Sequence, residues 1–314
     1  MTEFELIYTL INTQAVERAD VLTGIGDDCA ILSVPEGYSL AVSMDTLVES
    51  VHFPESASAF NIAYKALAVN LSDLASTGAT PAWLTLSLTM PQVDEAWIKE
   101  FVRGLFELAK QYNVQLIGGD TCSGPLSVSI QAHGFVKNPL LRSGARDGDL
   151  IYVSGTLGDA ALGLRSYQGE NNIAESCIKK FNQPQPRIEL GQCLSQYASS
   201  CIDISDGLIS DLGHICKQSR CGADVFLNKT PLSDEFVDYY NGEADYITAI
   251  TFGDDYELCF TIDENAVEHI TQFSVKSGLA LTCIGRITAS DTVNFLDHNN
   301  KIISIANRGF EHFK

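Results

Sequence analysis

The sequence predicts a mixed α/β protein with two domains, and three observations lead to this prediction. The chain has 314 residues, enough for one large domain or two ordinary ones. Hydrophobic residues make up 45% and charged residues 19%, which is enough apolar material for a large core. Helical and strand-like patterns alternate in two series, which the polar, turn-rich stretch KNPLLRSGARDGD at 137–149 separates. We therefore expect an N-terminal domain at 1–137 and a C-terminal domain at 138–314.

The first series contains two helical patterns among strand-like runs. Apolar side chains recur at helical spacing over 59–77, and Gly78 follows as a signal for the helix end. The same spacing recurs over 94–112, with acids and Lys110 on the opposite side. Four apolar or alternating runs have the composition of strands, at 39–44, 83–90, 114–119 and 127–136.

The second series begins with a strand at 150–155 that runs into a glycine-rich turn and a helix. Further patterns continue the alternation to the end of the chain. We expect helices near 187–199, 207–220 and 264–277, and strands near 201–204, 223–227, 256–262 and 281–287.

Charge and composition exclude several classes of protein. The chain has 20 Lys and Arg against 40 Asp and Glu, a formal charge of −20, so it lacks the basic surplus of a nucleic-acid binder. No apolar run approaches the roughly 20 residues that span a bilayer, so we expect no membrane segment. The first ten residues contain no basic residue, unlike a leader. Nine scattered cysteines without a CxxC pair indicate buried thiols in a reducing compartment, the cytoplasm.

Aspartates follow apolar strand-like runs at five places: GIGDDCA (24–30), SMDT (43–46), IGGDT (117–121), IDISDG (202–207) and FGDDYE (252–257). One more, Asp73, shares a helix face with Asn70. If the strand ends converge, the carboxylates would repel one another unless cations hold them, and oxygen ligands favour Mg²⁺ or Mn²⁺. Taken singly, each is more often a helix cap or turn residue, most clearly Asp206 before Gly207. The set that would converge is Asp27, Asp28, Asp45, Asp73, Asp120, Asp203 and Asp206.

Metals held by carboxylates usually serve phosphates. Two glycine-rich segments, 24–26 and 155–158, could bring backbone N–H groups to a phosphate, although neither matches a P-loop or a dinucleotide-binding fingerprint. Arg142 and Arg146 could clamp a nucleotide phosphate. No GxSxG elbow, HExxH motif or clear Cys-His pairing indicates another chemistry.

In this order along the whole chain, GIGDDCA, SMDTLVESVHF, YKALAVNLSDLA, LIGGDT, CIDISDGLISDLGHI and FGDDYELCF resemble the thiamine-monophosphate kinase family. This family belongs to the superfamily of aminoimidazole ribonucleotide synthetase. The resemblance implies ATP-dependent phosphorylation of thiamine monophosphate to thiamine diphosphate by direct in-line transfer, with several Mg²⁺ ions and no covalent enzyme intermediate. It also implies a cytoplasmic homodimer in which the N-terminal sheets of two subunits pair into a barrel.

The resemblance also assigns roles to residues. Asp254 stands where the family often has Glu, so one methylene of reach is lost. Met44 would contribute only its backbone carbonyl, and Phe310 would stack on an aromatic ring of the substrate. The implied metal ligands are Asp28, Ser43, Met44, Asp45, Asp73, Asp120, Asp203 and Asp206; the implied ATP contacts are Gly119, Asp120, Arg142 and Ser205; the implied thiamine phosphate contacts are His52, Asp254 and Phe310.

Two other functions stay open at this point. The chain could be an ATP-dependent synthetase of the same superfamily that uses another phosphorylated or carboxylated acceptor. It could also be a non-catalytic protein whose carboxylates hold Ca²⁺ for stability, although no EF-hand loop is present. The kinase is favoured because long stretches such as YKALAVNLSDLA and DISDGLISDLGHI resemble the kinase family and not only the acidic motifs of the superfamily. An acceptor that is already a phosphate is ionised at neutral pH and needs no strong base, which agrees with the lack of a catalytic His-Asp pair or Cys.

Overall fold

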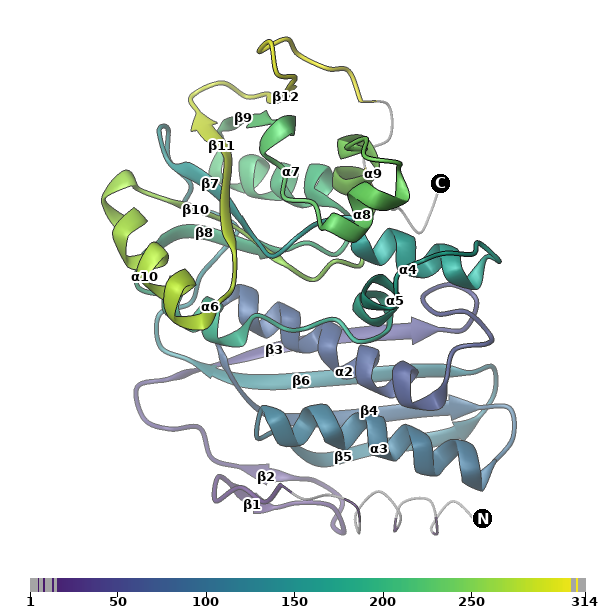
Figure 1. Ribbon diagram of the computed structural model, residues 1–314. Helices are drawn as coiled ribbons and strands as arrows, with labels where there is room; N and C mark the ends of the chain where they lie inside the picture. The colour runs from purple at the N-terminus through teal and green to yellow at the C-terminus, as the bar shows by residue number, and fades with distance from the viewer. Residues whose placement is uncertain (1–4, 6–7, 9–12, 14–15, 306–308, 310–314) are drawn as a thin grey trace. The chain divides into compact units, whose positions relative to one another are not determined.

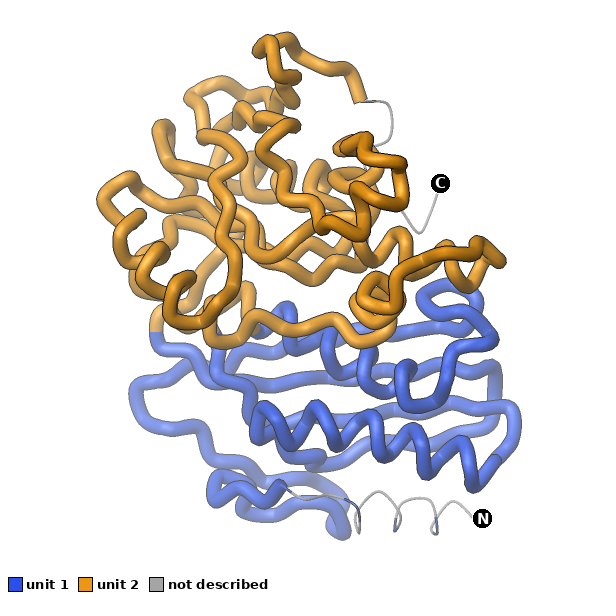
Figure 2. Tube along the Cα trace, viewed as in Figure 1, with its two compact units in different colours: residues 1–74, 79–137 blue, residues 75–78, 138–314 orange. Residues whose placement is uncertain are grey.

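The computed structural model describes Glu5, Tyr8, Thr13, residues 16–305 and Gly309. The chain divides into two compact units, which Figure 2 shows in different colours. Unit 1 contains residues 1–74 and 79–137, and unit 2 contains residues 75–78 and 138–314. Both units combine sheets with helices, as the sequence predicts for a mixed α/β protein.

Unit 1 is built on a four-stranded sheet with the order β3-β6-β4-β5. The strands are β3 (Ser39–Val48), β4 (Thr80–Met90), β5 (Gln115–Ser123) and β6 (Ser127–Val136). Strand β6 is antiparallel to both β3 and β4, whereas β4 and β5 are parallel. Two short strands, β1 (Val21–Thr23) and β2 (Ile31–Leu32), form a separate antiparallel pair.

Helices α2 (Ala59–Ser76) and α3 (Glu95–Gln111) lie along one face of this sheet (Figure 1). Helix α2 is buried from Ile62 to Ser72, which explains why most of this stretch is apolar, although Lys65, Asn70 and Ser72 are also buried. Helix α3 is amphipathic and begins at Asp94, whose carboxylate accepts N–H groups of its first turn. The two helices pack closely, because a Cβ added at Gly104 would lie 2.2 Å from the Phe60 carbonyl oxygen.

The opposite face of the sheet leaves apolar side chains of β3 exposed. Leu40, Val42 and Met44 are 42%, 51% and 60% exposed, and they alternate with side chains that face α2. Such a stripe of alternating apolar residues on a solvent face is unusual for a monomer.

Unit 2 contains a six-stranded sheet with the order β12-β9-β11-β7-β10-β8. Its neighbouring strands are antiparallel, except for the parallel pair β9 and β12. A core of buried residues such as Val153, Ile202 and Leu212 holds it together. The strands are β7 (Leu150–Ser154), β8 (Ala198–Asp203), β9 (Gly222–Phe226), β10 (Leu258–Ile262), β11 (Leu281–Thr288) and β12 (Val293–Leu296).

Most helices of unit 2 agree with the sequence patterns, and one is shorter. The helix expected near 187–199 ends at Leu194, because the chain turns and enters β8 at Ala198. Helix α7 packs against strands β8, β9 and β10. The helices are α4 (Asp159–Tyr167), α5 (Glu175–Asn182), α6 (Ile188–Leu194), α7 (Leu208–Ser219), α8 (Asp234–Tyr239), α9 (Tyr246–Thr251) and α10 (Val267–Ser277), with 3-10 turns η1 (Leu227–Lys229) and η2 (Glu264–Ala266).

The cysteines are all free thiols, and their burial is less uniform than expected. Five are buried, but Cys29 and Cys122 are exposed and two are half-buried. Within the described residues, no helix has the length and apolar character needed to cross a membrane.

Candidate functional site

Strand β3 and helix α2 place the first group of expected ligands together. The Ser43 hydroxyl donates a hydrogen bond to the Asp73 carboxylate, and the Asp45 N–H donates to the Asn70 side-chain oxygen at 3.2 Å. The Asn70 amide nitrogen donates to the Ala66 carbonyl, which fixes the orientation of this amide. The side chain of Met44 lies on the opposite, exposed face of β3, so only its backbone could serve this group.

A second group surrounds a cavity of about 220 Å³ in unit 1. The loop between β1 and β2 contributes Gly26, Asp27 and Asp28, and strand β5 contributes Gly118 to Thr121, including Asp120. Apolar residues such as Ile25 and Leu116 complete the lining. The cavity therefore combines glycine backbone, carboxylates and an apolar wall, as a nucleotide site requires.

Gly119 is required at this position by the approach of a neighbouring strand. A Cβ added to Gly119 would lie 1.9 Å from the carbonyl oxygen of Leu86 on β4. At Gly118 the same addition meets nothing within 4 Å. The backbones of β5 and β4 can thus approach each other at this point of the cavity wall only because Gly119 has no side chain.

The two groups lie at opposite edges of the sheet. Asp45 on β3 is level with Ile130, Leu86 and Gly119, and Asp120 belongs to the next row, beside Ser87. Three strand-to-strand steps of about 4.8 Å therefore place Asp45 and Asp120 roughly 14 Å apart. Within one chain these two carboxylates cannot hold the same ion. The expectation that both stand at strand ends is also wrong, because the ladder continues for three residues beyond each of them.

His52 lies in the turn after β3 and is half-buried. The ring Nδ1 of His52 accepts the backbone N–H of Val48 at 3.0 Å. The backbone N–H of His52 donates to the Val48 carbonyl at 2.9 Å. Because Nδ1 is an acceptor here, the neutral ring carries its proton on Nε2.

In unit 2, strand β8 ends at the buried Asp203, and residues 204–207 connect it to helix α7. The N–H groups of Ser205 and Asp206 both donate to one oxygen of Asp211, at 3.0 and 3.1 Å. Gly207 is the N-cap of α7, so Asp206 is not its cap and lies in the bend before it. Burial and the charge of Asp206 raise the pKa of Asp211 to about 7, against the opposing effect of the two N–H groups and Arg142.

The segment before β10 lies beside this loop because β8 and β10 are antiparallel, with Asp203 paired to Leu258. The N–H groups of Asp254 and Tyr256 donate to the carbonyls of Ser205 and Ile204, both at 2.9 Å. Asp254 and Tyr256 have left-handed backbones, with φ of 67° and 50°. Strain at two residues other than glycine is typical of functional segments.

Buried ionic contacts hold this strained segment in place. Glu257 is 3% exposed and accepts two hydrogen bonds from Arg187 and one from Ser154. Asp255 accepts the N–H of Gly158 at 3.1 Å. The Tyr256 hydroxyl donates to the Asp254 carboxylate at 3.2 Å, so the residue expected to contact substrate is itself oriented.

The remaining expected residues are less informative. The side chain of Arg142 is exposed, and its backbone carbonyl accepts the Ser219 hydroxyl. Phe310 lies outside the described residues. The sequence patterns did not single out Asp211. An acid among the apolar positions of the helix after IDISDG could have indicated a buried carboxylate there.

The donor set suits a hard divalent cation, because the expected ligands offer only oxygen atoms. Across residues 16–305 and the few other described positions, no three His, Cys, Asp or Glu side chains converge closely enough to hold a metal ion.

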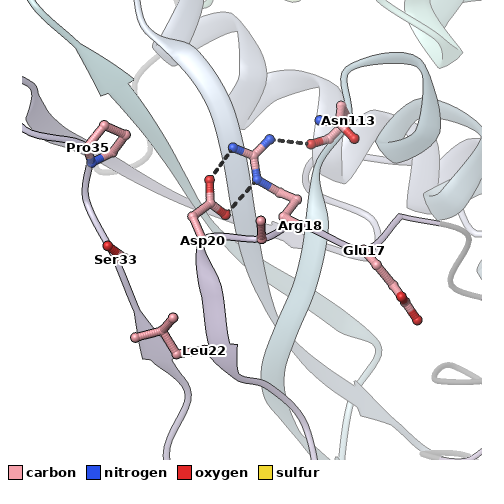
Figure 3. A pocket seen from close by; sticks show the side chains of 8 residues that line it. Glu17, Arg18, Asp20, Leu22, Ser33, Pro35 and Asn113 are labelled. Atoms are coloured by element: carbon pink, nitrogen blue, oxygen red, sulfur yellow. Dashed lines mark hydrogen bonds and ion pairs between the residues drawn. The ribbon is translucent and has the colours of Figure 1, made fainter.

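A more open pocket of about 500 Å³ lies near β1 and β2, and Figure 3 shows its lining. Arg18 and Asp20 are joined by two hydrogen bonds, of 3.0 and 2.6 Å, and Arg18 also donates to the Asn113 carbonyl. Asp20 further accepts the indole N–H of Trp83 at 2.8 Å. Arg18 and Asp20 in this pocket form an ion pair with each other, so we assign the pocket a structural role.

Comparison with known proteins agrees with the motifs. Residues 26–136 match the AIR synthase related protein, N-terminal domain, and residues 146–298 match its C-terminal domain. A thiamine-monophosphate kinase of Escherichia coli is 46% identical, covering 99% of this chain and 98% of the relative. The solved structure of thiamine-monophosphate kinase from Stenotrophomonas maltophilia is 41% identical with a TM-score of 0.88, covering 96% of this chain and 98% of the other.

A second solved structure, AaThiL complexed with AMPPCP and TMP, is 29% identical with a TM-score of 0.79, covering 99% of this chain and 97% of the other. The similarity thus extends over both units, and it confirms the family predicted from the motifs. The chain belongs to the thiamine-monophosphate kinases, a family of enzymes within the AIR synthase related proteins.

Proposed function

We propose that this chain transfers a phosphoryl group from ATP to thiamine monophosphate by direct in-line transfer, assisted by several Mg²⁺ ions. The observation that carries the proposal is the full-length similarity to thiamine-monophosphate kinases, 46% in the Escherichia coli relative. A related structure bound to AMPPCP and TMP supports both substrates. The glycine- and carboxylate-lined cavity of unit 1 supports a nucleotide at that position.

The residues proposed for the metal and the nucleotide are those that the family resemblance assigns. Mg²⁺ would neutralise the phosphate oxygens and align donor with acceptor. The backbone at Gly119 would approach the nucleotide, and Arg142 and Ser205 would contact it. The proposed metal ligands are Asp28, Ser43, the Met44 carbonyl, Asp45, Asp73, Asp120, Asp203 and Asp206.

The acceptor side needs binding groups rather than a base. The second pKa of a phosphate monoester is near 6, so its attacking oxygen is ionised at neutral pH. His52, whose proton is on Nε2, would donate a hydrogen bond to this phosphate. Asp254, oriented by the Tyr256 hydroxyl, would contact the thiamine portion, and we retain Phe310 as a proposed stacking residue. No residue is proposed to carry the phosphoryl group covalently.

We further propose a homodimer in which the unit 1 sheets of two copies close into a barrel. Two observations support it: the apolar stripe on β3, and the separation of Asp45 and Asp120 on opposite edge strands. In a closed barrel of two such sheets, β3 of one copy would lie beside β5 of the other, which removes exposed edges. Asp45 and Asp120 of different copies would then share an ion.

We place the reaction in the cytoplasm, because all nine cysteines are free thiols. Exposed thiols such as Cys29 and Cys122 persist in a reducing compartment.

The test is formation of thiamine diphosphate from thiamine monophosphate and ATP by the purified protein, with and without Mg²⁺. We expect product only with Mg²⁺, none with free thiamine, and no labelled protein after incubation with radioactive ATP. An isolable phosphoprotein, or activity after removal of divalent metal, would contradict the mechanism. Binding of ATP without product from thiamine monophosphate would contradict the acceptor and direct the search to other phosphorylated metabolites.

A further inference from the structure

Asp211 lies in the first turn of α7 and reaches back over the loop 204–207. It is 2% exposed, and one of its oxygens accepts the N–H groups of both Ser205 and Asp206. Helix α7 begins after Gly207, which has no side chain to cap it. Asp211 therefore supplies the acceptor for two backbone donors of this half-buried loop.

The other side of the same loop is held by the segment before β10. The Ile204 and Ser205 carbonyls accept N–H groups of Tyr256 and Asp254, and the Ile204 N–H donates to the Glu257 carbonyl at 2.8 Å. The contact is close, since a Cβ added at Gly253 would lie 1.9 Å from the Ser205 carbonyl oxygen. The carbonyls of Ile204 and Ser205 are thus held by the segment before β10, and the N–H groups of Ser205 and Asp206 are held by Asp211.

We propose that Asp211 is a positioning residue for metal-nucleotide binding: it holds the backbone of Ser205 and Asp206 so that their side chains face the nucleotide and its metal. This inference rests on the proposed function, which assigns those two residues to ATP and Mg²⁺. In this proposal Asp211 acts through the loop, because its accepting oxygen is directed at the backbone of Ser205 and Asp206.

The geometry makes a specific demand on the side chain at 211. Both donors go to a single oxygen, so an asparagine can accept both hydrogen bonds through its own side-chain oxygen. An alanine can accept neither. Hydrogen-bond positioning therefore predicts that Asp211→Asn retains function and that Asp211→Ala does not.

The experiment measures AMPPCP binding to the full chain in Mg²⁺ by calorimetry. We expect Asp211→Ala to weaken binding by about 10- to 100-fold, as loss of a group that orients a ligand residue does. Asp211→Asn should bind nearly as the wild type does. In turnover, Asp211→Ala should raise KM for ATP and leave KM for thiamine monophosphate unchanged.

Asp94→Ala is the matched control. One oxygen of Asp94 also accepts two N–H groups at a helix start, those of Ala96 and Trp97, but on α3 of unit 1. We expect this variant to lower Tm without changing AMPPCP affinity. A folded Asp211→Ala protein with wild-type affinity would overturn the proposal, and so would an Asp211→Asn protein as weak as the alanine variant.

If Asp211→Ala does not fold, amide hydrogen exchange in the wild type and in Asp211→Asn tests the proposal instead. The Ser205 and Asp206 amides should exchange slowly in the wild type and in Asp211→Asn; exchange as fast as in an open loop would overturn the proposal.

The proposed function and the positioning role of Asp211 can fail separately. If AMPPCP affinity depends on Asp211 but the wild type forms no thiamine diphosphate, only the acceptor is contradicted. If the wild type forms product and AMPPCP affinity does not depend on Asp211, only the positioning role is contradicted. A wild type that binds no AMPPCP contradicts both.

Discussion

The Ser43 hydroxyl on β3 donates a hydrogen bond to the Asp73 carboxylate on α2, so the sheet and the helix hold two proposed magnesium ligands against each other. Asp73→Asn keeps an oxygen that can accept this bond but removes the negative charge. We expect turnover to fall by about 100-fold or more and the Mg²⁺ requirement to rise, with little change in Tm.

The control for this charge is Asp94→Asn, because asparagine still caps α3 while one acid is lost from the same unit. Steady-state kinetics over a range of Mg²⁺ concentrations would compare the two variants. Wild-type turnover in Asp73→Asn at limiting Mg²⁺ would remove Asp73 from the proposed site.

Gly118 and Gly119 are neighbours on β5, and we expect only substitution of Gly119 by alanine to weaken binding and stability. A Cβ at Gly119 meets the Leu86 carbonyl at 1.9 Å, so Gly119→Ala must push β5 away from β4 and distort the cavity wall. We expect at least about 10-fold weaker AMPPCP binding and a lower Tm. Gly118→Ala, with nothing within 4 Å, should leave both nearly unchanged. Equal effects of the two substitutions on AMPPCP affinity and Tm would show that the close approach of β5 to β4 does not determine them.

The separation of Asp45 and Asp120 leads to a complementation test of the proposed dimer. Asp45→Asn and Asp120→Asn should each be nearly inactive alone. If one ion is shared between copies, a heterodimer of the two variants has one doubly substituted site and one intact site. A mixture made by co-expression should then recover about a quarter of wild-type activity, since half the dimers are mixed and each has one good site. No recovery in a mixture shown to contain heterodimers would contradict a shared site.

How far the sequence predicts this molecule depends on the range of the interactions. The helices over 59–77 and 94–112 are found within two residues, because their apolar spacing is a local property. Helices α8 and α9, of six residues each, are too short to produce a periodic signal. The strand order β3-β6-β4-β5 depends on long-range pairing, and it decides that Asp45 and Asp120 lie at opposite edges.

The same distinction applies to the candidate site. Motifs identify the aspartates because each stands beside glycine, serine or threonine, but they do not say what each carboxylate contacts. Taken singly, Asp206 reads as a helix cap or turn residue, but the motif does not predict that its N–H is accepted by Asp211, five residues further on. That relation requires the turn at Gly207, whose φ is 107°.

Asp254 replaces the glutamate that the family often has, and its role can be tested by changing the length of the side chain at this position. Asp254→Ala should raise KM for thiamine monophosphate by about 10-fold or more and leave AMPPCP affinity unchanged. Asp254→Glu restores the missing methylene and should retain activity, provided that the longer chain keeps the hydrogen bond from the Tyr256 hydroxyl. Tyr256→Phe should produce a weaker version of the alanine effect. An unchanged KM in Asp254→Ala would exclude contact between Asp254 and the acceptor.

The contacts of Asp20 with Arg18, which Figure 3 shows, and with the Trp83 indole predict how stability depends on pH in acid. Burial opposes ionisation of Asp20, but hydrogen bonds from Arg18 and Trp83 and the charge of Arg18 outweigh it and lower its pKa. A carboxyl whose pKa is lower in the folded than in the unfolded state stabilises the fold above the unfolded pKa, near 3.9. This contribution is lost as pH falls through the folded pKa.

Asp20→Asn should therefore cost about 1–3 kcal/mol of unfolding free energy at pH 7. It should also make the stability of the protein less steeply dependent on pH below about 4, because the variant has no carboxyl at this position to protonate. Urea unfolding at a series of pH values measures both effects. Glu17→Gln, an exposed acid beside the same pocket, is the control. Because the pocket is assigned a structural role, turnover of folded Asp20→Asn at pH 7 should equal that of the wild type, and a selective loss of turnover would contradict this assignment.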